Sequence, residues 1–274
     1  MARDPLESRP LIKVRGTVAC EEDGWIVVEE PLEIRVDGET LAVVMRTPGS
    51  DLELAAGFAL TEGVIRSPAD LGTIRHCPET RREMAAGGQN VVEIGLAPGV
   101  TLDRERMRRA LLTNAACGVC GKASLEALAT QARPVESALR VEKAVLGTLP
   151  ERLAGAQNVF QRTGALHAAG LFSATGDLRI CREDVGRHNA VDKVIGRALL
   201  DGAPTSDAIL LVSGRTSFEI LQKAAVAGIP VVCAVSGPTT LAIETARAFR
   251  ITLINFLRGG DMSIAACPER VAGL

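Results

Sequence analysis

The spacing of hydrophobic residues changes along the chain and separates a β-rich first third from a last third with a strand–helix rhythm. Residues 24–49 alternate apolar and polar side chains, and Asp37-Gly38 within them is a hairpin turn signal. Residues 51–65 carry leucine and alanine at helical spacing, which predicts a helix, and residues 89–99 predict a further strand. The first third is therefore expected to form a small α+β unit.

The middle of the chain combines a basic helical pattern with a glycine-rich cysteine loop. Residues 101–114 predict a helix with one strongly basic face, and residues 124–132 predict a short helix. Between them lies CGVCG, residues 117–121. A basic face of this kind is typical of a solvated helix surface, although its place just before the cysteines also suits an anionic partner or a partner protein.

The last third predicts three buried strands that alternate with two helices. Each strand is a continuous apolar run, which is typical of a largely parallel sheet covered by helices. The ligand crevice of such a sheet lies beyond the carboxyl ends of its strands. Three loops should therefore open on one edge: SGRTS at 213–217, SGPTT at 236–240 and FLRGGD at 256–261. Thr216 and Glu219 also have the spacing of a capping box.

A hairpin pattern and a dense polar cluster precede this region. Residues 165–184 predict a hairpin that turns at 175–177, and residues 189–199 predict an amphipathic helix. The segment where they meet holds six polar residues: Arg182, Glu183, Asp184, Arg187, His188 and Asn189. This cluster fits either a helix cap with local ion pairs or a functional site. His167 in the hairpin fits equally a buried core histidine or a site residue.

Composition narrows the class of protein. The chain has 274 residues, of which 47% are hydrophobic, enough for two domains with sizeable cores. With 31 basic and 33 acidic residues, no tyrosine and 3% aromatic residues, it lacks the basic surplus and the stacking side chains of a nucleic-acid binder. The N-terminus is charged without the apolar segment of a secretory signal, and no apolar run is long enough to cross a membrane. We therefore expect a cytoplasmic protein whose seven cysteines are mostly reduced.

Cys117 and Cys120 are the strongest candidates for chemistry. The thiolate is the reactive form of cysteine, and a helix N-terminus that follows, with Lys122 beside it, favours that form. Gly118 and Gly121 allow backbone amides to approach a sulfur anion. One cysteine could carry a transferable sulfur as a persulfide while the other resolves it or holds it by hydrogen bonding, and this chemistry needs no metal.

Three other interpretations of the cysteine pair stay open. A structural zinc site needs four ligands, whereas a single CxxC supplies two and the chain has no second CxxC. A thioredoxin-like redox pair is expected after the first strand of a βαβ unit, usually with an aromatic neighbour, and neither is found here. Both cysteines could also be small buried hydrophobes, as Cys233 inside a predicted strand is expected to be.

Several of these segments together resemble a known family. The segments are TNAACGVCGKAS, TGALHAAGLF, REDVGRHNAVDKVIG, SGRTSFEILQKAAVAGIPVV, AVSGPTTLAIETA and NFLRGGD. In this order they resemble the formate dehydrogenase accessory sulfurtransferase family (FdhD), and the resemblance runs from about Asp51 to Ala266.

The resemblance implies a sulfurtransferase. Members of that family take sulfur from a cysteine desulfurase as a cysteine persulfide and pass it to the molybdenum bis-guanine-dinucleotide cofactor, their bound substrate, for formate dehydrogenase. By motif position, Cys117 would bear the persulfide and Cys120 would assist it. The resemblance also implies a homodimer, and no permanently bound metal is expected. The alternative is a non-catalytic chaperone that binds the molybdenum cofactor during assembly of formate dehydrogenase.

The resemblance further implies a fold class and a domain division. The fold would be α/β, with a smaller β-rich α+β domain at residues 1–112 and a cytidine-deaminase-like domain with a mixed, largely parallel sheet at residues 113–274. Deaminase activity itself is rejected. A zinc deaminase needs a glutamate two residues after its metal-binding histidine, and His167 is followed by Ala168 and Ala169.

The same resemblance assigns residues to the cofactor. The expected cofactor-binding residues are Phe256, Leu257, Arg258, Gly259, Gly260, Asp261, Arg215 and His167. A basic residue is expected at the end of the segment 256–261, where this chain has Asp261. Arg258 is therefore the better candidate for a cationic contact at that position.

Overall fold

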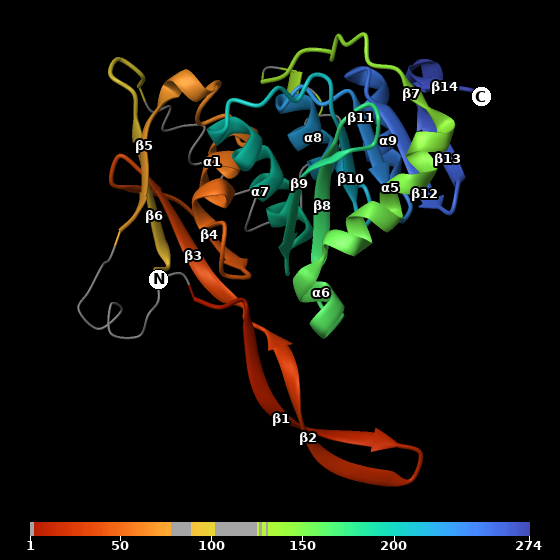
Figure 1. Cartoon of the computed structure of the whole chain (residues 1–274). Coiled ribbons are helices and arrows are strands. Elements are labelled where there is room, and N and C mark those ends of the chain that lie inside the picture. Colours follow the sequence, from red (N-terminus) through yellow and green to blue (C-terminus); the bar gives the residue numbers. More distant parts are fainter. Residues whose placement is uncertain (1–2, 78–88, 102–124, 126–127, 130) are drawn as a thin grey trace.

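The structure, a computed structural model, describes residues 3–77, 89–101, 125, 128–129 and 131–274 (Figure 1). Cys117 and Cys120, most of the helix expected at 101–114 and part of that expected at 124–132 lie outside the described residues. Among the described residues, no helix is long and apolar enough to span a membrane.

The chain begins with a long two-stranded arm that the sequence did not predict as such. Strands β1 (Leu6–Arg15) and β2 (Val18–Val27) pair only with each other, in antiparallel register. The arm projects away from the rest of the molecule (Figure 1). The arm contacts the body through a cation–π interaction, in which the Arg162 guanidinium of α6 (Asn158–Thr163) lies 4.1 Å from the centre of the Trp25 ring of β2.

A four-stranded sheet follows the arm, in the order β4-β3-β6-β5. Its strands are β3 (Glu30–Val36), β4 (Glu39–Arg46), β5 (Leu71–His76) and β6 (Val91–Leu96), and a short 3-10 turn (Pro68–Asp70) precedes β5. The expected hairpin turn is confirmed, because Asp37 and Gly38 both have positive φ between β3 and β4. The helix predicted from the apolar spacing of residues 51–65 is confirmed as α1 (Asp51–Thr61), and it packs on one face of this sheet.

The larger part of the chain forms a six-stranded mixed sheet, in the order β13-β12-β11-β10-β8-β9. The predicted hairpin is β8 (His167–Phe172) and β9 (Leu178–Asp184). The three predicted buried strands are β10 (Ile209–Val212), β11 (Val231–Ala234) and β12 (Thr252–Arg258), which are parallel to one another. Strand β13 (Asp261–Ala266) returns antiparallel to β12. The expected α/β class with a mixed sheet is confirmed.

Helices cover both faces of this sheet. One face is covered by α7 (Arg187–Leu200), α8 (Phe218–Val226) and α9 (Thr240–Ala248). The other face is covered by α5 (Lys143–Ala156), which is followed by the short α6. The two-residue strands β7 (Val141–Glu142) and β14 (Val271–Ala272), with a 3-10 turn (Pro268–Arg270), pair beside α5. Cys233 is completely buried in β11, as predicted. Apolar side chains on both faces of the central strands explain their unbroken hydrophobic runs.

The four-stranded sheet joins the larger sheet through the packing of α1 on α7. A Cβ built on Gly57 would lie 1.9 Å from the Asp192 carbonyl oxygen, and one on Gly196 would lie 1.8 Å from that of Glu53. Only glycine therefore permits this close approach. One hydrophobic core runs from the small sheet through both helices to the large sheet. The domain boundary expected after residue 112 lies outside the described residues and stays a prediction.

The expected capping box at α8 is wrong. The N-cap is Ser217, and its side chain accepts no hydrogen bond from the helix. Thr216 is instead buried, and its hydroxyl accepts a hydrogen bond from the Asn255 amide of β12 at 2.9 Å. A tertiary contact across the sheet edge thus uses the side chain that local spacing assigned to the helix.

Candidate functional site

The predicted loops after β10 and β11 meet at the carboxyl edge of the parallel strands. The loop 213–217 follows β10 and the loop 236–240 follows β11. The Thr239 amide donates to the Thr216 carbonyl at 3.0 Å, and the Phe256 amide of β12 donates to the Ser236 carbonyl at 3.2 Å. These bonds hold the ends of three strands together, so the edge predicted from the strand pattern exists as a connected surface.

His167 lies at the same edge because β8 runs antiparallel to β10 and begins where β10 ends. The Ser213 amide donates to the Ala168 carbonyl at 2.9 Å, which fixes this register. Gly214 lies against the imidazole, since a Cβ built there would be 3.4 Å from His167 Nδ1. Burial, with a smaller contribution from the Arg187 charge, lowers the pKa of half-buried His167. The lowered pKa favours the neutral imidazole, which can offer an N–H to a ligand.

The polar cluster found in the sequence divides into two groups with different roles. Four of its residues make contacts that stabilise the fold. Arg182 pairs with Glu53, and Asp184 pairs with Lys193 at 2.7 Å. The Glu183 carboxylate accepts hydrogen bonds from amides in the first turn of α6, and the Asn189 amide donates to the Met45 carbonyl. These contacts match the interpretation as caps and ion pairs. Arg187 and His188 differ, because they lie at the start of α7 facing the loop after β10.

His188 lies between α7 and α8. Its Nε2 is 3.5 Å from the Ser217 hydroxyl and 3.9 Å from a Glu219 carboxylate oxygen. Burial, then the positive charges of Arg187 and Lys223, lower the pKa of His188 to about 4. Both contacts are made by the same ring nitrogen. The group therefore lacks the arrangement of a serine hydrolase, in which a carboxylate orients the other nitrogen.

The segment 256–261 does not form a single surface. Phe256 lies at the carboxyl edge with a positive φ of 54° and about half of its surface exposed, against Gly237. Leu257 is fully buried in the core on the α5 side. Gly259 and Gly260 form the hairpin turn between β12 and β13.

The remaining members of the predicted set are exposed. Arg258 and Asp261 face each other across the turn that ends β12, and Arg215 lies in the loop after β10. All three side chains are accessible to a ligand. Their assignment to the cofactor, like that of the rest of the set, stays a prediction.

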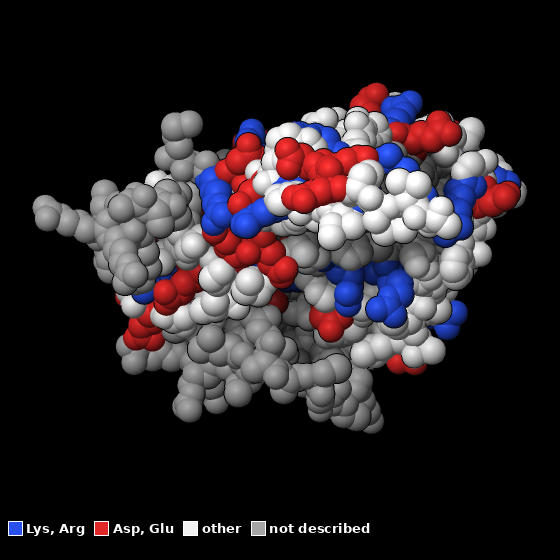
Figure 2. All heavy atoms as spheres, turned by 90° about the horizontal axis from the view of Figure 1, so that it is seen from below, with Lys and Arg blue, Asp and Glu red and all other residues white. Residues whose placement is uncertain are grey.

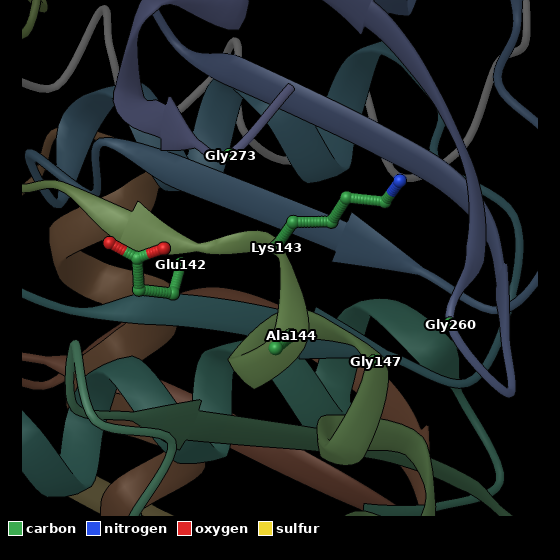
Figure 3. A pocket seen from close by; sticks show the side chains of 6 residues that line it. All are labelled: Glu142, Lys143, Ala144, Gly147, Gly260 and Gly273. Carbon is green, nitrogen blue, oxygen red and sulfur yellow. The ribbon is translucent and has the colours of Figure 1, made fainter.

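A pocket of about 360 Å³ lies beside that turn, at the start of α5. Its lining residues are Glu142, Lys143, Ala144, Gly147, Gly260 and Gly273. Figure 3 shows the Lys143 side chain reaching out on the side of Gly260, whereas the Glu142 carboxylate points to the opposite side. The chain thus passes from the carboxyl edge, at Phe256, to this pocket beside α5, at Gly260.

Most of the described thiols are unsuited to form thiolates. Burial raises the pKa of Cys233 well above its usual range, that of Cys181 to about 11, and also that of Cys267. A hydrogen bond to the Glu22 carboxylate raises the pKa of Cys20. Cys117 and Cys120, the predicted reactive pair, lie outside the described residues. No cluster of three or more metal-ligating side chains is found among the residues that the structure describes.

Two features of the edge have no signal in the local sequence. Asn255 at the end of β12 is completely buried and bonds both Thr216 and the Ser236 carbonyl. Ser217, the N-cap of α8, contacts His188 of α7. Both residues act through tertiary contacts between strands and loops that are far apart in the chain, and nothing in their local sequence marks those contacts.

Comparison with known proteins finds similarity along nearly the whole chain. A family model described as the FdhD/NarQ family matches residues 27–272. A sulfur carrier protein FdhD from Streptomyces avermitilis is 48% identical over 270 residues, which cover 97% of this chain and 95% of the relative. One of the same name from Mycobacterium tuberculosis is 48% identical over 251 residues, 90% of this chain and 91% of the relative.

A solved structure shows the same fold at lower sequence identity. The crystal structure is of a candidate formate dehydrogenase accessory protein from Desulfotalea psychrophila, with a TM-score of 0.78, 23% identity, and coverage of 98% of this chain and 100% of that chain. The likeness extends over the whole molecule. Because the family model spans most of the chain and relatives almost half identical align along nearly all of it, the chain belongs to the FdhD/NarQ family.

Proposed function

We propose that this protein is a sulfurtransferase that carries sulfur as a persulfide on Cys117 and delivers it to the molybdenum bis-guanine-dinucleotide cofactor used by formate dehydrogenase. The observation that carries the proposal is close relationship: proteins named sulfur carriers are 48% identical over nearly the whole chain. The name of the solved neighbour connects that protein with formate dehydrogenase. The sulfur donor would be a cysteine desulfurase, and the acting form a homodimer.

The chemistry of loading follows from thiol–disulfide exchange. The Cys117 thiolate attacks the outer sulfur of the donor's persulfide, the donor's S–S bond breaks, and the donor leaves as a thiolate. For delivery, the Cys120 thiolate attacks Cys117 Sγ, which is the inner sulfur of the persulfide. The outer sulfur then leaves as sulfide while a Cys117–Cys120 disulfide forms. The two thiols supply the two electrons that reduce the transferred sulfur, and the disulfide must be reduced before the next cycle.

The carboxyl edge supports cofactor binding on this chain. An anionic nucleotide suits Arg215 at the edge and Arg258 beside the turn, and a neutral His167 can donate to a ligand oxygen. Figure 2, seen from below, shows several basic side chains gathered on that face of the molecule. The edge is also where open parallel sheets bind nucleotides in general.

Activity in cells distinguishes this proposal from a chaperone that binds the cofactor without chemistry. A strain that lacks the native protein is complemented with the wild-type chain, with Cys117→Ala, with Cys120→Ala or with Cys20→Ala. We expect formate dehydrogenase activity to be lost with Cys117→Ala, to be strongly reduced with Cys120→Ala and to be normal with the Cys20→Ala control. Normal activity in both loop variants would favour the chaperone and reject the sulfurtransferase.

A further inference from the structure

The arm formed by β1 and β2 is only two strands wide, and most of its surface is exposed. A hairpin of two strands is only marginally stable by itself in water. The arm projects from the body (Figure 1), and its side chains bury little surface. Six of the twelve exposed large hydrophobic residues that the structure describes lie on it: Leu11, Ile12, Val14, Val18, Trp25 and Ile26. Such a concentration is typical of a surface that contacts another molecule.

The backbone groups of the arm alternate between its inside and its two outer edges. The Val28 amide donates to the Pro5 carbonyl at 2.9 Å, so this pair is bonded across the arm. Every second pair of an antiparallel ladder is bonded in this way, and the residues between them turn their N–H and C=O groups outward. The unbroken register of β1 and β2 therefore places the backbone groups of Ala19, Glu21 and Asp23 on the outer edge of β2.

The two outer edges differ in whether a further strand can pair with them. On the β1 edge, the Leu6 amide already donates to the Asp4 carboxylate at 2.9 Å, and Pro10 has no N–H to offer. An outward proline is one of the ways in which proteins prevent strand addition. On the β2 edge, residues 19–23 include no proline, and their outward groups bond no other residue in the described part of the chain. Of the two edges, that of β2 is therefore the open one.

The open edge carries acidic side chains that no described residue neutralises. Glu21 and Asp23 are exposed, and because they lie two residues apart on one strand they point to the same face of the arm. Neither forms an ion pair with a described residue. Glu22, on the opposite face, is instead paired with Lys13 at 3.0 Å and with Arg15 at 3.2 Å. A strand that pairs with this edge would therefore gain from basic side chains beside the two unpaired acids.

The β2 strand of a second copy does not suit this edge. Antiparallel pairing of two β2 strands over residues 19–23, about a two-fold axis, would bring the acidic side chains of both copies opposite one another. Like charges directly opposite each other in a sheet are destabilising. The charge of the edge therefore favours a strand of a different sequence, one that carries positive charge.

We propose that the β2 edge of the arm, residues 19–23, binds an extended basic segment of a partner protein by strand addition. Main-chain hydrogen bonds to the outward N–H and C=O groups would give affinity, and lysine or arginine side chains beside Glu21 and Asp23 would give specificity. Apolar side chains at the alternate positions of the segment would pack on the opposite face, beside the exposed Val18. This surface shares no residue with the carboxyl edge of the large sheet.

Trp25 reports whether this edge is occupied, because it is the only tryptophan of the chain and lies on β2 two residues beyond Asp23. The probe is a short peptide of alternating lysine and valine, added to the full-length protein at low ionic strength. We expect saturable binding with a blue shift of the Trp25 emission, since strand addition removes water from the half-exposed ring. The same peptide with glutamate in place of lysine should bind at least about 10-fold more weakly. No binding of the lysine peptide would overturn the inference.

Charge reversal on the arm should exchange the preference for the two peptides. The double variant Glu21→Lys with Asp23→Lys should bind the lysine peptide roughly 10-fold more weakly than the wild type and the glutamate peptide more tightly. Glu136→Lys with Glu151→Lys, two exposed acidic residues of the body, is the matched control with the same change in net charge and should keep the wild-type preference. Equal affinities of the arm variant and the wild type would overturn the inference.

Two further measurements separate strand addition from charge attraction alone and from self-association. N-methylation of every second residue of the lysine peptide removes the N–H groups of one of its edges, so one of the two possible methylated peptides should lose binding and the other should keep it. Equal binding of both would contradict strand addition. In sedimentation, the arm variant should have the oligomeric state of the wild type. A changed state would assign the edge to a second copy and would also overturn the proposal.

Discussion

At the residue scale, buried charged side chains connect helices that are distant in sequence. Lys223 of α8 lies 2.8 Å from Asp192 of α7 and donates to the Thr61 hydroxyl at the end of α1. Thr61 in turn donates to Asp192 at 2.8 Å. Three helices that are distant in sequence therefore share one closed polar network. In the sequence Asp192 and Lys223 look like ordinary polar positions of amphipathic helices, so their pairing could not be predicted.

Removal of Lys223 should destabilise the protein strongly. In Lys223→Ala, Asp192 would stay buried without its counter-ion, which typically costs about 3–5 kcal/mol in the free energy of unfolding. Arg179→Ala is the matched control, since Arg179 pairs with Asp207 at the surface and should contribute no more than about 1 kcal/mol. Urea denaturation measures both. Equal stability losses in the two variants would contradict the structural role of the buried network.

The titration of His188 should report the positive charge of Arg187. The chain has three histidines, so the imidazole signals can be assigned by substitution and followed by NMR. The groups that act on His188 are Arg187, Lys223 and His167, which lower its pKa together with burial, and Glu219, which raises it. We expect a midpoint far below 6.5 in the wild type and a higher midpoint in Arg187→Gln. An identical midpoint in both proteins would show that Arg187 does not face this imidazole.

The lowered pKa of His188 makes the stability of the protein depend on pH. Between about pH 4 and pH 6.5 the unfolded chain binds a proton at His188 that the folded protein does not bind. This group therefore lowers the free energy of unfolding as the pH falls through that window, and its contribution is constant above it. His188→Gln should lose less stability than the wild type between pH 7 and pH 5 in urea titrations. A larger loss in the variant would mean that the sign is wrong.

At the scale of elements, the sequence predicts well what depends on local pattern. Turn residues predict the hairpin at Asp37-Gly38, and helical spacing of apolar residues predicts α1. Strands that are apolar on both faces predict the alternation of strands and helices from β10 to β12. The arm β1–β2 was not predicted, because its strands carry many charged side chains and bury almost no residue. The capping box failed because Thr216 bonds Asn255 across the sheet edge.

The crossing of α1 and α7 should not tolerate a methyl group. Gly57→Ala and Gly196→Ala each place a Cβ less than 2 Å from a carbonyl oxygen of the facing helix, at 1.9 Å and 1.8 Å respectively. The helices must move apart, and we expect a loss of about 1–3 kcal/mol or more in the free energy of unfolding. Gly155→Ala on α5 is the control, since nothing lies within 4 Å of its Cβ and alanine favours a helix by about 0.5–1 kcal/mol. Thermal denaturation that ranks the three variants alike would contradict this packing.

At the scale of the whole molecule, the sequence predicted which loops meet at one edge of the sheet better than how the segment 256–261 is arranged. Open sheets place their crevice beyond parallel strand ends, and the structure brings His167, Arg187 and the loops after β10 and β11 to that edge. The segment 256–261 is instead divided between the edge, the core and a turn beside α5. Such a division depends on the φ of Phe256 and on the bend that follows, which no periodicity records.

Whether Cys117 carries the sulfur can be measured from the intact mass of the protein after incubation with a cysteine desulfurase and cysteine. We expect the wild type and Cys20→Ala to gain about 32 Da per sulfur, a gain that a reducing agent removes. Cys117→Ala should gain nothing, and peptide mapping should place the added mass at Cys117 in the wild type. If Cys117→Ala gains the same mass as the wild type, Cys117 is not the sulfur carrier.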